Sequence, residues 1–133
     1  VSGNRVSLGE AATPIFAAAR LGAELGRAQL PFKDESRLPT GSFKARGMAM
    51  AITMANEFGI RRVACPTAGN AGGAMAAYAS RAGMESFVLM PDDTPIIYPS
   101  RWKRQKGQSI SRRCDRLQRS GEMPPFLQSC ITT

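Results

Sequence analysis

The hydrophobic positions near the start of the chain follow first a helical period and then a short extended run. Leu21 and Leu25, four residues apart, predict a helix from Ile15 to about Leu25, which Gly26 can terminate. A short strand is predicted over Leu30–Lys33, where apolar and polar residues no longer follow the helical spacing. The pattern therefore predicts a helix and then a strand before the first long loop.

A longer helical pattern begins at Ser42, after a loop over residues 34–41 that contains proline and glycine. Its apolar residues recur at spacings of three and four and predict one buried face, made of Phe43, Gly47, Met50, Met54 and Phe58. A serine at the start can cap the free N–H groups of the first turn. Gly59 marks the predicted end of this helix.

Strand and helix patterns then alternate with short connections. The sequence predicts a strand over Arg62–Pro66, a tight loop over Thr67–Asn70, a helix over Ala71–Ala82 with Met75, Tyr78 and Ala82 on one side, and a strand over Ser86–Met90. This order predicts an α/β fold in which helices cover a parallel sheet. Ligands of such sheets bind beyond the carboxyl ends of the strands, near helix N-termini. The two motifs described below fall at that place.

The pattern changes after Ile97. Residues 98–133 hold serine, arginine, glutamine and proline clusters without a sustained period, which predicts a disordered basic tail behind a partial domain at residues 1–97. Residues 1–97 carry ten Lys and Arg against eight Asp and Glu, and residues 98–133 carry eight against two, so the tail holds +6 of the net charge of +8. Nucleic-acid binding through the tail is an alternative, but no motif indicates a specific nucleic-acid partner.

Composition narrows the function classes further. The chain has no histidine and three widely spaced cysteines, which excludes Ser-His-Asp chemistry and argues against a disulfide framework or a cysteine metal site. No apolar stretch is long enough to span a bilayer, so no membrane association is expected and a reducing cytoplasm is the predicted location. The chain begins with Val1 rather than Met, which is consistent with a fragment.

One lysine lies where chemistry is expected. Lys44 ends the run Thr40-Gly41-Ser42-Phe43-Lys44, between a predicted strand and a predicted helix. The field of the helix N-terminus and partial burial would depress the pKa of this amine and favour its use as a nucleophile that forms a Schiff base. The same helix start could receive a phosphate or a carboxylate. Taken alone, the run could equally be an ordinary loop and cap that precede a solvated surface lysine.

Longer runs carry a family resemblance. The chain resembles the superfamily of threonine synthases and threonine dehydratases, pyridoxal-phosphate (PLP) enzymes of fold type II, in the runs Gly9 to Pro14, Lys33 to Ser36, Pro39 to Gly47, Thr67 to Gly72, Ala76 to Ala79, Ala82 to Met84 and Val88 to Pro91. The combination of Lys33-x-Glu35, the lysine run and a Gly-Asn-Ala-Gly loop most resembles threonine synthase. The similarity covers roughly residues 7–97.

The resemblance implies a fold and a set of roles. The fold would be part of a three-layer parallel sheet with flanking helices, incomplete because the second domain has no match. Lys44 would bind PLP covalently and Asn70 would hydrogen-bond its ring hydroxyl, while Phe43 would pack on the helix face rather than touch the cofactor. The carboxylate of a small amino-acid substrate would be held by the loop, made of Thr67, Ala68, Gly69, Asn70 and Ala71. No metal is implied, and intact relatives would be homo-oligomers.

The implied reaction converts O-phospho-L-homoserine and water into L-threonine and phosphate. A threonine or serine dehydratase and a non-catalytic remnant are the alternatives. Nothing in the sequence matches the glycine-rich loop that anchors the PLP phosphate in relatives, so the chain by itself is expected to be inactive. Family-like sequence ends after about Ile97, which favours the hypothesis of a truncated gene or a shifted reading frame.

Overall fold

The computed structural model describes residue 3, residues 5–90 and residues 108–111. Its elements, in chain order, are β1 (Ile15–Ala17), α1 (Ala19–Glu24), β2 (Pro31–Lys33), a 3-10 turn η1 (Glu35–Arg37), α2 (Lys44–Glu57), β3 (Arg62–Pro66), α3 (Asn70–Arg81), β4 (Glu85–Met90) and β5 (Gln108–Ser111). The predicted change of character at Ile97 lies outside the described residues. Among the described residues, no helix is long and apolar enough to cross a membrane.

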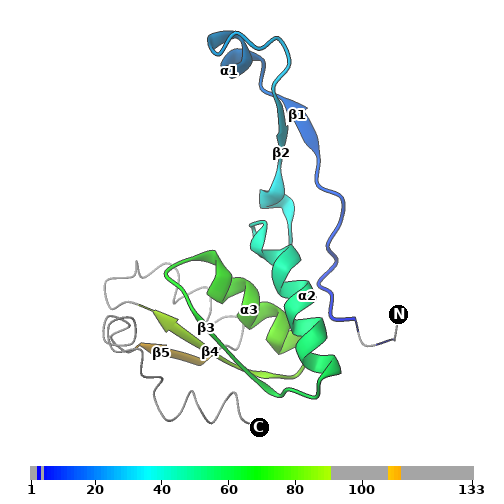
Figure 1. Cartoon of the computed structure of the whole chain (residues 1–133), viewed down its shortest axis with the longest axis vertical. Coiled ribbons are helices and arrows are strands. Elements are labelled where there is room, and N and C mark those ends of the chain that lie inside the picture. Colours follow the sequence, from blue (N-terminus) through cyan, green and yellow to red (C-terminus); the bar gives the residue numbers. More distant parts are fainter. Residues whose placement is uncertain (1–2, 4, 91–107, 112–133) are drawn as a thin grey trace.

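The predicted parallel sheet is present. Strand β4 lies between β3 and β5 and pairs in parallel with both. Helix α3 connects β3 to β4, so these three elements form the strand–helix–strand unit that the alternating pattern predicts (Figure 1). The four residues of β5 belong to the segment assigned to the tail, where the sequence pattern had indicated no strand.

The first elements form an arm, defined as residues 15–33, that extends away from the rest of the molecule (Figure 1). The predicted helix over residues 15–25 is wrong at its start, because Ile15–Ala17 is a strand that pairs antiparallel with β2. The N–H of Ala18 donates to the carbonyl of Leu30 at 2.9 Å, and the helix begins only after this bond. Gly26, with φ of 65°, follows the helix as predicted.

The core lies in the body, defined as α2, α3 and strands β3 to β5. Helices α2 and α3 lie side by side and α3 packs on the sheet (Figure 1). The predicted inner side of α3 is confirmed, since Met75 and Tyr78 are buried and Ala82 packs against the core. Tyr78 and Val88 are the largest fully buried side chains. The buried cluster comprises Val6, Leu38, Ala45, Ile52, Met75, Tyr78, Ala79, Met84, Val88 and Met90.

The predicted buried face of α2 is wrong. The large side chains of that face are all exposed, and they are Phe43, Met50, Met54 and Phe58. The helix instead buries its other apolar stripe against the core, through Ala45, Met48, Ala49, Ile52 and Ala55. Both stripes follow the helical period, and small alanines let α2 approach α3 closely. This exposed stripe leaves large apolar side chains of α2 in contact with water.

The start of α2 also differs from the prediction. The cap position is Phe43 rather than Ser42, and no side chain caps the first turn. The hydroxyl of Ser42 is buried and has no hydrogen-bond partner, and the same holds for the hydroxyl of Thr40. This loop therefore carries two polar atoms whose partners the described part of the chain does not supply.

Candidate active site at the carboxyl end of the strands

The topology brings Lys44 and Asn70 to the same end of the sheet. Lys44 is the first residue of α2 and Asn70 is the first residue of α3. A short turn connects the end of α2 to the start of β3, and a short loop connects the end of β3 to the start of α3. Both helices therefore run antiparallel to β3 and begin near the carboxyl end of this strand (Figure 1). This is the end at which parallel sheets bind ligands. The predicted location of both motifs is therefore confirmed.

Lys44 is exposed, and its amine lies over the aromatic side chain of the preceding residue. Its Nζ lies 4.8 Å from the centre of the Phe43 ring. Phe43 is 61% exposed, so the prediction that it packs on the helix face is wrong. A cation close to an aromatic face is attracted by the ring quadrupole, and this contact orients the amine at the helix start.

Cys65, which the sequence analysis did not select, belongs to the surroundings of Lys44. It is the residue before the last of β3 and is half-buried. Burial raises the pKa of its thiol, and the ammonium of Lys44 acts in the opposite direction and lowers it. The one sequence signal for Cys65 is its place two residues before the Thr67 loop.

The loop over residues 67–70 closes on itself through the Thr67 side chain. The N–H of Gly69 donates to Thr67 Oγ1 at 3.0 Å, and the N–H of Thr67 donates to the carbonyl of Leu89 at 2.8 Å. Gly69 is the cap position of α3, no side chain caps that helix, and its first turn has no acidic residue. An uncapped helix start of this length offers N–H groups to an anion. The structure thus brings Thr67, Ala68, Gly69, Asn70 and Ala71 together at one helix N-terminus.

The residues present fit the reactive end of a PLP molecule. An exposed primary amine can reach an aldehyde, and the exposed Asn70 at the start of α3 can offer a carboxamide to a ring hydroxyl. The hydroxyls of Thr40 and Ser42 lie in the loop before α2 and have no hydrogen-bond partner among the described residues. This donor set is what an aldehyde-bearing polar ring requires, so the chemistry of the site is compatible with PLP.

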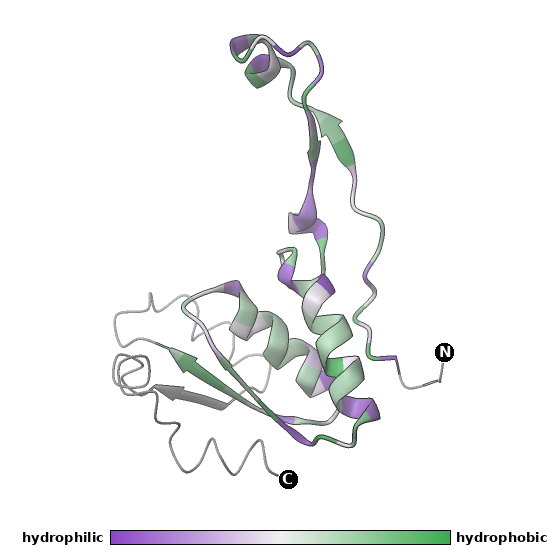
Figure 2. Cartoon of the chain, in the orientation of Figure 1, coloured by the Kyte–Doolittle hydropathy of each residue, from purple (hydrophilic) through white to green (hydrophobic). Residues whose placement is uncertain are grey.

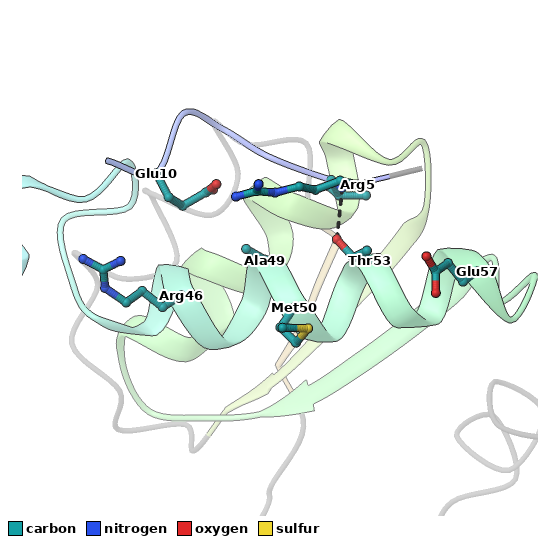
Figure 3. A pocket seen from close by; sticks show the side chains of 8 residues that line it. Arg5, Glu10, Arg46, Ala49, Met50, Thr53 and Glu57 are labelled. Carbon is teal, nitrogen blue, oxygen red and sulfur yellow. Dashed lines mark hydrogen bonds between the residues drawn. The ribbon is translucent and has the colours of Figure 1, made fainter. Parts of the chain in front are cut away.

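A separate groove lies between the N-terminal segment and α2. It has a volume of about 380 Å³ and is lined by Arg5, Val6, Glu10, Arg46, Ala49, Met50, Thr53 and Glu57 (Figure 3). The N–H of Val6 donates to Thr53 Oγ1 at 3.0 Å across it. Neither Lys44 nor the Thr67 loop lines this groove. The groove lies where the N-terminal segment packs against α2.

The carboxylate of Glu10 connects the N-terminal segment to the core. Glu10 accepts hydrogen bonds from Ser7 Oγ at 2.6 Å, from the N–H of Leu8 at 3.0 Å and from the buried hydroxyl of Tyr78. Burial acts to raise the pKa of Glu10, but these hydrogen bonds outweigh it and lower the pKa to about 2. Burial and the Glu10 contact raise the pKa of Tyr78.

Comparison with known proteins identifies the class. The profile of the family "Pyridoxal-phosphate dependent enzyme" matches residues 6–117, so the chain belongs to this family. The match continues past Ile97 and includes β5. PLP is accordingly the cofactor of this class of protein, as the resemblance implied.

Among the relatives with similar sequences are several threonine synthases. The threonine synthase of Methanocaldococcus jannaschii is 45% identical over 87 residues, which are 65% of this chain and 22% of the relative. The threonine synthase of Mycobacterium leprae is 48% identical over 86 residues, 65% of this chain and 24% of the relative. The chain therefore spans about a quarter or less of the length of these relatives.

Solved structures confirm the fold. A PLP-dependent aspartate racemase superposes with a TM-score of 0.75 and 28% identity, over 89% of this chain and 40% of that one. A threonine deaminase from Solanum lycopersicum superposes with a TM-score of 0.64 and 25% identity, over 77% and 28% of the two chains. The fold is that of PLP enzymes of type II, as the sequence resemblance predicted.

Proposed function

We propose that this chain is the lysine-bearing part of a PLP-dependent lyase of the threonine synthase type. The reaction would convert O-phospho-L-homoserine and water into L-threonine and phosphate, and the intact protein would be a homo-oligomer of the cytoplasm. The main support is that Lys44 and Asn70 are the first residues of α2 and α3, and that both helices begin at the same end of the sheet. The identity with threonine synthases supports this reaction over others of the family.

In this proposal each residue has a defined task. PLP, when bound, supplies the electron sink that allows bonds next to the substrate nitrogen to break. Lys44 Nζ would hold the aldehyde carbon of the cofactor and, once displaced by the substrate amine, would carry protons. Asn70 would donate a hydrogen bond to the ring hydroxyl. The N–H groups at the start of α3, with the Thr67 hydroxyl, would bind the substrate carboxylate.

The chain by itself is expected to show little turnover. The match covers 22% of the Methanocaldococcus jannaschii protein, so the wall of the site opposite Lys44 must come from sequence beyond the matched region. An amine on an open face is hydrated and holds an aldehyde weakly. Labelling of Lys44 is therefore the direct test on this chain, and turnover is tested after the site has been completed.

The labelling test uses the purified full chain with PLP, followed by borohydride reduction and peptide mapping. Modification is expected to concentrate on Lys44 and to disappear in Lys44→Ala. The matched variant Lys106→Ala should leave the Lys44 adduct unchanged. Even labelling of all lysines in the wild-type chain would show that the half-site does not form.

The reaction itself is tested in a chimaera. Residues 6–90 of this chain would replace the matched segment of the Methanocaldococcus jannaschii threonine synthase. Phosphate release from O-phosphohomoserine, lost in Lys44→Ala, is the expected result. Ammonia release from threonine instead would favour a dehydratase. The similarity to a threonine deaminase is the observation that makes this the alternative to test. A folded chimaera with neither activity would favour the remnant interpretation.

A further inference from the structure

Three charged residues of the family signature meet in one cluster, although they have no role in the proposed chemistry. Arg46 Nε donates to Glu35 Oε2 at 2.7 Å and Arg46 Nη2 donates to Glu35 Oε1 at 3.1 Å, so the two groups form a two-point pair. Lys33 Nζ lies 3.8 Å from Glu35 Oε1. A guanidinium–carboxylate pair of this kind fixes both distance and orientation.

A buried threonine from the N-terminal segment completes the cluster. The hydroxyl of Thr13 donates to Glu35 and accepts from Arg46 Nη2 at 3.4 Å, and the Thr13 carbonyl accepts from Lys33 Nζ at 3.1 Å. The hydrogen bond from Arg46, then that from Thr13, lowers the pKa of Glu35 to about 2. Glu35 in turn raises the pKa of Arg46. Both groups therefore stay charged near neutral pH.

The position of the cluster links it to Lys44. Arg46 lies in the first turn of α2, two residues after Lys44, while Glu35 lies in η1 before the loop that leads into α2. No side chain caps this helix start, and the hydroxyls of Thr40 and Ser42 in the connecting loop make no hydrogen bond. The side chain of Arg46 thus connects the first turn of α2 to other segments, through hydrogen bonds to Glu35, Ala11 and Thr13.

Stability alone does not account for the arrangement. The side chains of Arg46 and Glu35 are 43% and 22% exposed. Ion pairs with this access to water add little to stability, so the fold does not depend on this one. A pair that adds little stability can still restrict the direction in which a helix start points, because its geometry is narrow.

We infer that Glu35, Arg46 and Thr13 are positioning residues that hold the first turn of α2 so that Lys44 Nζ faces the Asn70 loop. The inference rests on the proposed role of Lys44. It assigns a task to Glu35 and Arg46, which the signature contains without an evident chemical role. Small errors in the placement of a reacting group lower rates steeply. Loss of the pair should therefore impair the binding of a large aldehyde at Lys44 while the fold remains.

The test compares two aldehydes on the full chain. PLP and formaldehyde are each reduced onto lysines with borohydride, and adducts at Lys44 are quantified by mass spectrometry in wild type, Glu35→Gln and Arg46→Lys. PLP labelling of Lys44 should fall roughly tenfold in both variants. Formaldehyde labelling and the circular dichroism spectrum should be unchanged, since a small aldehyde needs no defined direction of the amine.

A neighbouring carboxylate provides the matched control. Asp34 pairs with Arg37 at 3.2 Å in the same turn but does not contact α2, so Asp34→Asn should leave both labels unchanged. Equal PLP labelling of Lys44 in wild type and Glu35→Gln would overturn the positioning role and leave the proposed function standing. A parallel fall of both labels with loss of helicity would overturn it in favour of a role in folding. Absence of specific PLP labelling in the wild type would show that the half-site does not form in this chain and would overturn the positioning role with it, whereas the chimaera tests the proposed reaction separately.

Discussion

The arm and the body contain similar apolar residues but use them differently. In the arm, every large apolar side chain other than the half-buried Leu30 is more than a third exposed, namely Ile15, Phe16, Leu21, Leu25 and Phe32. In the body, Tyr78 and Val88 have almost no exposed surface. The difference arises because α2, α3 and the sheet form two layers, whereas nothing in the described chain covers the hairpin (Figure 2). Apolar composition stabilises a segment only where a second layer removes it from water.

The arm is held by local contacts. Three pairs of residues join β1 to β2, and the rings of Phe16 and Phe32 stack with centres 5.9 Å apart. A hairpin of two strands without a covering layer is marginally stable in water. The arm should therefore open on its own, at a lower free energy than the body requires to unfold. The predictions below make the same substitution in both regions.

The largest contrast is expected for two isoleucines. Ile52 is 3% exposed in the core and Ile15 is 66% exposed on the arm. Ile52→Ala should lower the free energy of unfolding by about 2–5 kcal/mol, since it removes buried methyl groups and leaves a cavity. Ile15→Ala should change it by less than about 0.5 kcal/mol. Urea unfolding followed by circular dichroism measures both, and similar losses would mean that Ile15 is covered in solution.

The sequence predicted the body better than its surroundings for a physical reason. Strands β3 and β4 and helix α3 follow one apolar pattern each, and the lysine and asparagine motifs are contiguous, so local information is sufficient for them. Helix α2 has two apolar stripes, and the choice between Ile52 and Met50 depends on where α3 lies. Likewise, Ile15 was predicted to be helical but lies in a strand because it pairs with β2. The contact of Glu35 with Arg46 joins segments whose approach no local pattern encodes.

A smaller contrast is expected for two glutamates. Glu10 accepts hydrogen bonds from Ser7, Leu8 and Tyr78 at the body, whereas Glu24 on the arm lies 4.0 Å from the exposed Arg20. Glu10→Gln should cost about 2 kcal/mol at neutral pH, because hydrogen bonds to a charged group are lost. Glu24→Gln should cost less than about 0.5 kcal/mol. Both values are measured by urea unfolding at pH 7.

The pH dependence separates the two glutamates further. The pKa of Glu10 falls from 4.5 to about 2 on folding, so its contribution is complete above pH 4.5 and disappears as the pH falls toward 2. Wild type should therefore lose stability over this window, and Glu10→Gln should lose less. Glu35, whose pKa is also about 2, sets part of the remaining slope. Identical slopes in wild type and Glu10→Gln would contradict the assigned carboxylate contacts.

The smallest contrast is expected for two glycines inside helices. A Cβ at Gly22 in α1 would lie 2.6 Å from the carbonyl oxygen of Arg27, whereas a Cβ at Gly47 in α2 would meet nothing within 4 Å. Gly47→Ala should stabilise the body by about 0.5–1 kcal/mol, since alanine restricts the unfolded chain. Gly22→Ala should destabilise the arm by about 1 kcal/mol, because the backbone must shift to admit the methyl group.

Amide hydrogen exchange reads the two regions separately. In Gly22→Ala, amides of residues 15–33 should exchange faster while those of α3 and β4 keep their protection. In Gly47→Ala, protection should rise across α2, α3 and β4 and stay unchanged in the arm. If Gly22→Ala instead lowered protection equally in the arm and in β4, the two regions would unfold as one cooperative unit. In that case the exposed hairpin would be coupled to the core despite the lack of a covering layer.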